Sequence, residues 1–213
     1  MSHGAVLDDL NFTAFMSSKI CHDLVGPVGA ISNGLELLEE ETDEQTRAYA
    51  LELIQFSANV ARNRLEFARL AFGASSALGS DVDLGMVEKI ARAFVEEGKH
   101  TLHWSAYQGE LEKTRVRLLL TTLTIAMTAV PAGGNIHVTM TGGKDAPDLE
   151  IRCSGRGARI PPEIAGMLSG NGGEINPRSI IDYYAIRLAE DCGMPLTVRK
   201  DDDDIVFSAK TMR

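Results

Sequence analysis

The chain has 213 residues, of which 44% are hydrophobic, and a formal net charge of −9 at pH 7. This hydrophobic fraction is enough to bury a core, so the composition argues against a largely disordered chain. The negative charge repels phosphate backbones and anionic lipids, so neither nucleic-acid binding nor membrane binding is expected. Acidic chains of this size more often bind other proteins.

The cysteines indicate a reducing environment. Only Cys21, Cys153 and Cys192 occur, widely separated and without a CxxC pair. An odd, scattered set of this kind argues against a disulfide framework and against a zinc site. The first ten residues, MSHGAVLDDL, lack the charged start and apolar stretch of a signal peptide, and no apolar run reaches membrane-spanning length. We therefore expect a cytoplasmic protein.

Residues 10–40 show the pattern of a helix with one buried seam, because apolar residues recur at alternating steps of four and three: Leu24, Val28, Ile31, Leu35 and Leu38. After an acidic turn, Thr42 and Gln45 fit a capping box at the start of a second helix. Its apolar positions are Leu51, Ile54, Ala58, Ala61, Leu65, Ala68 and Phe72. The sequence therefore predicts a helical hairpin over residues 10–73.

A single hairpin of this length would leave its apolar seams facing water. We therefore expect it to pair with a second copy, which gives a homodimer built on a four-helix bundle. The alternative is that the hairpin packs against the rest of its own chain, because a seam pattern does not specify its partner.

The small, polar stretch 73–80 resembles a linker, so we divide the chain into a helical dimerisation hairpin, 1–78, and a second domain, 79–213. The second part alternates helical and strand patterns, typical of an α+β domain. Helices are expected at about 84–97, 113–130 and 179–191, and strands at about 101–107, 135–140, 149–153, 196–199 and 205–209.

The stretch HDLVGP, residues 22–27, contains the candidate site. At about 100° per residue, His22 lies roughly opposite the seam, so its imidazole should face solvent. A neutral imidazole can act as a nucleophile. Asp23 could orient the ring or hold its proton, although adjacent side chains on a helix diverge.

Gly26 lies four residues after His22 on the same face and would clear space for a large partner. Lys19, three residues before His22, could neutralise an anionic group near the ring. Pro27 removes the hydrogen bond to the Asp23 carbonyl and should kink the helix. Together these residues suggest phosphoryl transfer to and from His22, but on spacing alone a plain surface histidine beside a helix break fits equally well.

HDLVGP resembles the H box of two-component histidine kinases, which lies in the first helix of a dimerisation hairpin. The second domain resembles their ATP-binding half, the Bergerat fold, with its nucleotide residues replaced. In LLLTTLTIAMTAV, residues 118–130, Thr121 and Ile125 stand where the kinases have magnesium-binding asparagines. Cys153 stands where an aspartate reads adenine. In NPRSIIDYYAIRLAE, residues 176–190, four bulky residues replace phosphate-loop glycines: Ile180, Ile181, Tyr183 and Tyr184.

An intact H box beside replaced nucleotide residues resembles the histidine phosphotransferases of alphaproteobacteria. The resemblance implies a dimer that takes a phosphoryl group from the receiver domain of a CckA-like hybrid histidine kinase onto His22. It then passes the group to CtrA-like and CpdR-like response regulators, with no cofactor of its own and with magnesium supplied by the receiver. Two alternatives stay open: an ATP-dependent histidine kinase with a divergent pocket, and a non-catalytic adaptor that binds a partner through the kinase-like domain.

Overall fold

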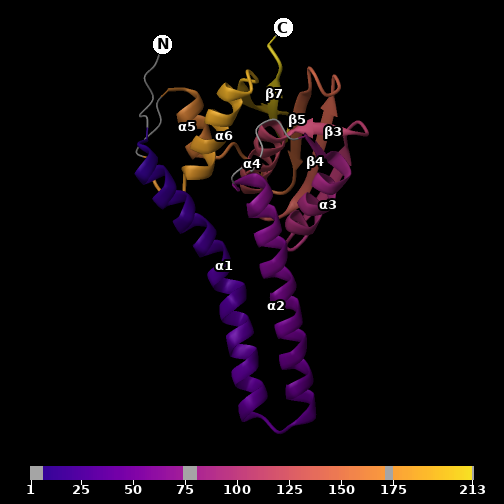
Figure 1. The fold of residues 1–213 in the computed structure, drawn as a ribbon. Helices are drawn as coiled ribbons and strands as arrows, with labels where there is room; N and C mark the ends of the chain where they lie inside the picture. The colour runs from indigo at the N-terminus through magenta and orange to yellow at the C-terminus, as the bar shows by residue number, and fades with distance from the viewer. Residues whose placement is uncertain (1–6, 74–80, 171–174, 213) are drawn as a thin grey trace.

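Two long helices form the N-terminal part of the computed structural model, which describes residues 7–73, 81–170 and 175–212. Helix α1 (Asp9–Glu40) and helix α2 (Glu44–Ala71) run antiparallel as a hairpin (Figure 1), which confirms that prediction. The carboxylate of Asp43 caps α2 by accepting from the Thr46 amide at 2.8 Å. The predicted capping box on Thr42 is therefore wrong by one residue, because Asp43 rather than Thr42 precedes the first helical residue.

The C-terminal part is an α+β sandwich, as predicted. Its main sheet has the strand order β2-β4-β5-β7-β6, in which only the β2 and β4 pair is parallel. These strands are β2 (His100–Ser105), β4 (Gly134–Thr141), β5 (Asp148–Ser154), β6 (Leu196–Asp201) and β7 (Asp204–Lys210). Two short strands, β1 (Asp81–Asp83) and β3 (Glu110–Glu112), pair antiparallel beside it.

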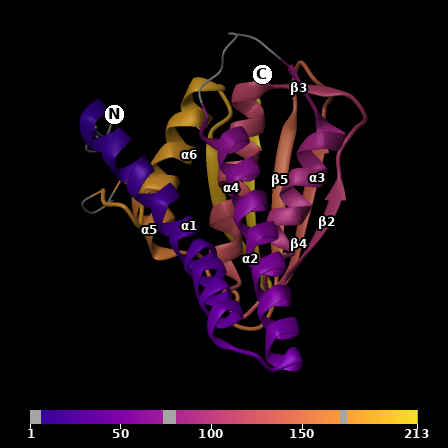
Figure 2. The same ribbon diagram turned by 60° about the horizontal axis from the view of Figure 1, so that its bottom comes forward.

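Helices cover one face of the main sheet (Figure 2). They are α3 (Leu84–Val95), α4 (Lys113–Ala129) and α6 (Ile180–Asp191), with the short α5 (Pro162–Leu168) beside α6. The sequence patterns predicted the three long helices and the five longer strands to within a few residues. Strands β1 and β3 and helix α5 were missed, because two strands of three residues and a helix of seven residues are too short to show a recognisable periodicity.

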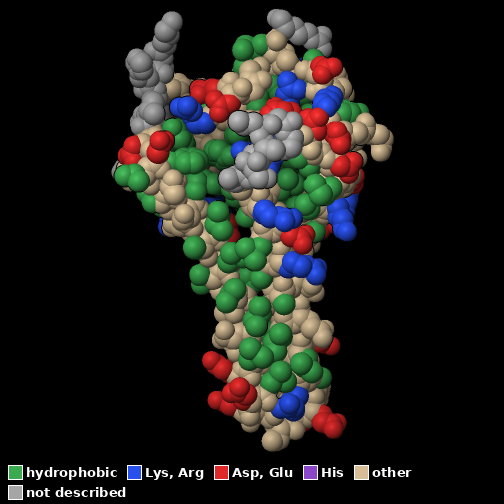
Figure 3. Space-filling view, in the orientation of Figure 1, with side chains coloured by type: hydrophobic (Ala, Val, Ile, Leu, Met, Phe, Trp, Pro, Cys, Tyr) green, Lys and Arg blue, Asp and Glu red, His purple; other side chains and the backbone are tan. Residues whose placement is uncertain are grey.

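The two hairpin helices meet through small residues. The positions buried along the hairpin include Pro27, Gly34, Ala50 and Ser57. A Cβ added at Gly34 would lie 2.6 Å from Ile54 Cγ1, so glycine is needed for this close approach. The predicted seam is only partly buried: Val28 and Leu35 are 52% and 50% exposed, whereas Leu24, Ile31 and Leu38 are intermediate in burial. Hydrophobic side chains accordingly run along the surface of the stem (Figure 3).

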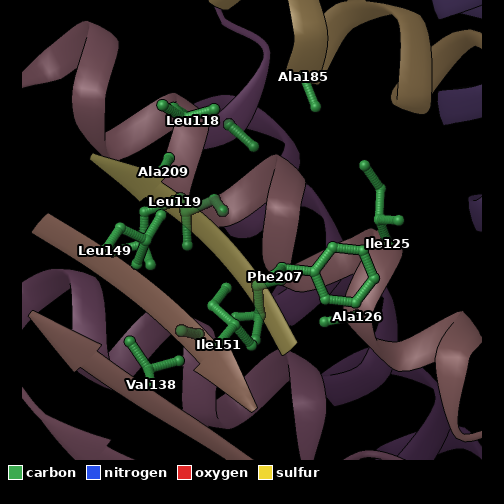
Figure 4. Packing of buried hydrophobic residues seen from close by; sticks show 14 of the residues in the cluster. Leu118, Leu119, Ile125, Ala126, Val138, Leu149, Ile151, Ala185, Phe207 and Ala209 are labelled. Carbon is green, nitrogen blue, oxygen red and sulfur yellow. The ribbon is translucent and has the colours of Figure 1, made fainter. Parts of the chain in front are cut away.

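Helix α4 and strands β5 and β7 supply the centre of the core, where Phe207, Ile151, Leu119 and Ala126 are buried against one another (Figure 4). The alternation of buried and exposed residues along β4 matches a sheet with one face in the core. Each large apolar side chain that is fully buried stabilises the fold by about 1.5–3 kcal/mol.

The upper end of the hairpin packs on this domain. Met16 and Phe67 belong to the same buried cluster as the C-terminal core, and Phe67 stacks on Phe94 of α3 with ring centroids 3.9 Å apart. The alternative that the hairpin packs on its own chain therefore holds for the upper end, whereas the lower stem projects away (Figure 1). The boundary between 78 and 79 and the predicted linker, apart from its first residue Gly73, fall in 74–80, outside the described residues.

None of the helices in the described ranges is long and apolar enough to cross a membrane.

Candidate functional site

His22 lies on the surface of α1, near the middle of the helix. Its side chain is 86% exposed, as the helical geometry predicted. The imidazole is accessible to a partner protein from outside the hairpin. This exposure also means that the histidine has no part in the core.

Asp23 and Lys19 flank the imidazole on its Nδ1 side. Nδ1 of His22 lies 3.4 Å from Oδ1 of Asp23, and the Lys19 ammonium donates to the other carboxylate oxygen, Oδ2. Lys19, which we expected near an anionic group beside the ring, is thus paired with Asp23. Because Nδ1 faces the carboxylate, Nε2 on the far side of the ring is the nitrogen available for reaction.

Gly26 and Pro27 follow on the same helix and differ in burial. Gly26 is exposed, and a Cβ built there meets nothing within 4 Å, so packing within the chain does not demand glycine. Pro27 is buried, and α1 continues through it to Glu40. The helix is not broken at this point, and a kink there stays a prediction.

Arg64 of α2 is a site residue whose contacts within the chain were not predicted from the sequence. Its Nη1 donates to the carbonyl oxygen of Asp23 at 2.6 Å, and its Nε donates to Oε2 of Glu97 at 3.0 Å. Burial raises the pKa of Glu97, and the guanidinium of Arg64 opposes that rise. The one available signal was Pro27, which leaves the Asp23 carbonyl without a helical donor and so requires a donor from elsewhere.

A small cavity lies behind this group. It has a volume of about 20 Å³, room for roughly one water molecule, and is lined by Lys19, Asp23 and Arg64 together with Phe67, Phe94 and Ile181. Its walls come from the hairpin, α3, α4 and α6. The polar residues next to His22 therefore lie at the junction of the hairpin and the C-terminal domain.

The positions that resemble the nucleotide site of kinases are buried in the core. Thr121 and Ile125 of α4 are 0% and 3% exposed, and the Thr121 hydroxyl donates to carbonyls of its own helix, 2.7 Å from the oxygen of Arg117. Cys153 of β5 is fully buried, and burial raises the pKa of its thiol to about 12. These side chains are not presented to a ligand.

The side chains at the start of α6, in the stretch that resembles the phosphate loop of kinases, are also largely buried. Ile180 and Ile181 are 0% and 4% exposed, and Tyr184 packs against Phe12 of α1 with ring centroids 5.6 Å apart. Asp182 is 8% exposed, and burial, with a smaller contribution from Glu163, raises its pKa to about 7. Within the described residues, no group of three or more His, Cys, Asp or Glu side chains is placed to hold a metal ion.

Comparison with known proteins agrees with this arrangement. Residues 84–204 match the family described as the histidine phosphotransferase C-terminal domain. The chain is 39% identical over 212 residues to the protein phosphotransferase ChpT of Brucella abortus (strain 2308), covering 99% of this chain and 100% of that protein.

Solved structures show the same relationship. A bacterial phosphotransferase solved at 1.7 Å superimposes with a TM-score of 0.89 and 38% identity, covering 97% of this chain and 99% of that one. The histidine kinase domain of the blue-light activated kinase EL346 of Erythrobacter litoralis shares the fold at a TM-score of 0.51 and 15% identity, over 86% of this chain and 95% of that one. The expected likeness to the kinase ATPase fold is thus confirmed, and the chain belongs to the histidine phosphotransferase family, as a protein phosphotransferase of the ChpT type.

Proposed function

We propose that this chain is a phosphorelay intermediate in which Nε2 of His22 accepts a phosphoryl group from one receiver domain and passes it to another. The observation that supports this most is the 86% exposure of an imidazole whose Nδ1 already faces a carboxylate. Such a ring presents its second nitrogen to a macromolecular partner.

The transfer is a displacement at phosphorus. The Nε2 lone pair attacks the aspartyl phosphate of the donor receiver, the N–P bond forms as the acyl O–P bond breaks, and the aspartate carboxylate leaves with the electron pair. The phosphorylated ring keeps its proton on Nδ1 and becomes positively charged. Asp23, 3.4 Å from Nδ1, stabilises that charge, and the reverse displacement on a second receiver returns the ring to its neutral form.

The chain supplies neither nucleotide nor metal in this scheme. Thr121 and Cys153, at two positions where kinases hold magnesium and adenine, are buried and directed into the core, so these residues do not fit ATP. Magnesium comes from the acidic pocket of the partner receiver.

The partners that we propose are receiver domains: that of a CckA-like hybrid histidine kinase as donor, and those of CtrA-like and CpdR-like response regulators as acceptors. The open space around Gly26 supports a protein partner, because a glycine one helical turn from His22 leaves room for a folded domain close to the imidazole. The three cysteines are free, which suits a cytoplasmic location, and the net charge of −9 disfavours nucleic acid and membrane surfaces.

We also propose a homodimer. Large apolar side chains along the hairpin are between 49% and 69% exposed: Val25, Val28, Leu35, Tyr49, Leu51, Phe56 and Leu65. A second hairpin packed against them would bury this surface in a four-helix bundle. Sedimentation of the full chain tests this, and a species of monomer mass at micromolar concentration would contradict it.

A radiolabel experiment tests the transfer. The purified chain is incubated either with labelled ATP and magnesium or with a receiver domain that carries labelled phosphoryl on its aspartate. We expect label from the receiver only and no label on His22→Ala, whose fold should be unchanged because the side chain is exposed.

Each other outcome favours a different function. Labelling from ATP alone would support a histidine kinase with a divergent pocket. An absence of label from both donors, together with tight binding of the receiver, would support a non-catalytic adaptor.

A further inference from the structure

Pro27 creates a specific demand in α1. In a regular helix the amide four residues later donates to each carbonyl, but proline has no N–H, so the carbonyl of Asp23 loses its helical donor. The helix nevertheless continues through this position with Pro27 buried. A buried or half-buried carbonyl without a donor is unfavourable, so another donor must be found.

Arg64 supplies that donor from the neighbouring helix. Its Nη1 lies 2.6 Å from the Asp23 carbonyl oxygen, a short, charge-assisted hydrogen bond. The contact joins residues 41 positions apart. It lies directly at the phosphotransfer site, because the side chain of Asp23 is the one next to Nδ1 of His22.

Glu97 holds Arg64 from the other side. The Nε atom of Arg64 donates to Oε2 of Glu97 at 3.0 Å, and the carboxylate side chain is only 10% exposed. Glu97 follows the C-terminal end of α3, so this ion pair crosses from the hairpin to the C-terminal domain. The planar guanidinium can serve both partners at once, which a lysine ammonium in the same place could not do with the same geometry.

We propose that Arg64 is a positioning residue for phosphotransfer, which replaces the donor that Pro27 removes and fixes the backbone beside His22 to the C-terminal domain through Glu97. This inference rests on the proposed role of His22 as the phosphoryl acceptor. On this proposal the C-terminal domain contributes without binding a nucleotide. It holds the guanidinium of Arg64, which positions the backbone of the phosphotransfer site.

A double-mutant cycle between Pro27 and Arg64 separates positioning from a purely structural ion pair. Pro27→Ala restores an amide that can donate to the Asp23 carbonyl, so Arg64 becomes less necessary in that background. The rate of transfer from a phosphorylated receiver is measured for the full-length wild type, Arg64→Met, Pro27→Ala and the double variant. The temperature is one at which circular dichroism shows all four folded.

We expect Arg64→Met to lower the rate about tenfold in the wild-type background and no more than about twofold in the Pro27→Ala background, because a misplaced reactive group is costly. Arg64→Lys should fall between wild type and Arg64→Met. Arg62→Met, on the exposed face of the same helix, is the matched control and should transfer within about twofold of wild type. The carbonyl ¹³C resonance of Asp23 should move in Arg64→Met and move back in the double variant.

Equal losses in the two backgrounds, or an unchanged rate in Arg64→Met, would overturn the positioning role and leave the proposed function intact. Transfer to His22→Ala, or an absence of transfer to the wild type, would instead overturn the proposed function and this inference with it.

Discussion

His22 in the hairpin and Asp182 in the C-terminal domain are both ionisable, but they differ strongly in their exposure to solvent. The imidazole of His22 is 86% exposed, with its Nδ1 3.4 Å from the carboxylate of Asp23. The carboxyl of Asp182, at the start of α6, is 8% exposed, and burial raises its pKa to about 7. The hairpin presents the imidazole outward, whereas the C-terminal domain encloses a carboxyl in a stretch that resembles the phosphate loop of kinases.

This difference indicates what each region contributes. A histidine that exchanges phosphoryl groups with folded receivers needs access and a defined orientation, which an exposed helix face provides. The C-terminal domain keeps the kinase fold, but its apolar replacements, such as Ile180 and Ile181, contribute packing. It is joined to the backbone beside His22 through the Glu97–Arg64 ion pair, which is its contribution to the site in our proposal.

The largest expected effect on stability comes from placing a charged side chain in the buried region that resembles the nucleotide site of kinases. Cys153→Asp restores the residue that reads adenine in kinases, but it places a carboxylate at a fully buried position of β5. We expect the free energy of unfolding to fall by about 3–5 kcal/mol, with no gain in ATP binding. Urea denaturation and nucleotide titration measure the two quantities, with Cys153→Ala as the control for lost packing. Preserved stability together with ATP binding would show that the pocket is intact.

The second effect is a pH dependence centred on Asp182. Its folded-state pKa of about 7 lies above the ordinary value of 3.8, so between these values the folded chain binds one proton more than the unfolded chain. The corresponding stability is fully present below about pH 4 and is lost as the pH rises through about 7. The loss amounts to about 2–4 kcal/mol.

Asp182→Asn removes this titration. The variant should match the wild type near pH 4.5 and exceed it at pH 8 by about 2–4 kcal/mol in the free energy of unfolding. Urea unfolding at four or five pH values checks this difference. Two parallel curves would mean that the carboxyl does not titrate in the enclosed position.

The smallest effect compares two glycines on α1. Gly34→Ala should lower the free energy of unfolding by about 1–3 kcal/mol, because the new Cβ would lie 2.6 Å from Ile54 Cγ1. Gly26→Ala has no neighbour within 4 Å and should raise it by about 0.5–1 kcal/mol through helix propensity.

The rate of transfer from a phosphorylated receiver should change in the variant whose stability is not reduced, Gly26→Ala. It should slow in Gly26→Ala, where the methyl group occupies the face used by the partner, and stay unchanged per folded molecule in Gly34→Ala. Full transfer by Gly26→Ala would show that this face is not part of the contact.

Sequence periodicity was sufficient for most of the fold and for the exposure of His22. The pattern of Leu24, Ile31 and Leu38 defined α1, and the angle per residue placed the imidazole away from that seam. It did not identify the contact between the helices, because glycine and alanine at Gly34 and Ala50 bring the backbones together without a hydrophobic signal.

The hydrogen bond from Arg64 to Asp23 could not be predicted from periodicity either, for a related reason. The role of Arg64 is to meet a backbone carbonyl 41 residues away, so the target of the contact carries no residue type that a pattern could show. Similarly, the acidic strand β3 is recognisable only through its register with β1. Contacts made to the backbone depend on how the elements pack, which local periodicity does not encode.

The most direct test of the central claim is to locate the phosphoryl group after mixing the chain with a phosphorylated receiver, by tandem mass spectrometry under conditions that preserve phosphoramidates. We expect a phosphoramidate on His22, bonded through Nε2 in the corresponding ³¹P NMR spectrum, and none after incubation with ATP and magnesium. A phosphoryl group on another residue, or one acquired from ATP, would contradict it.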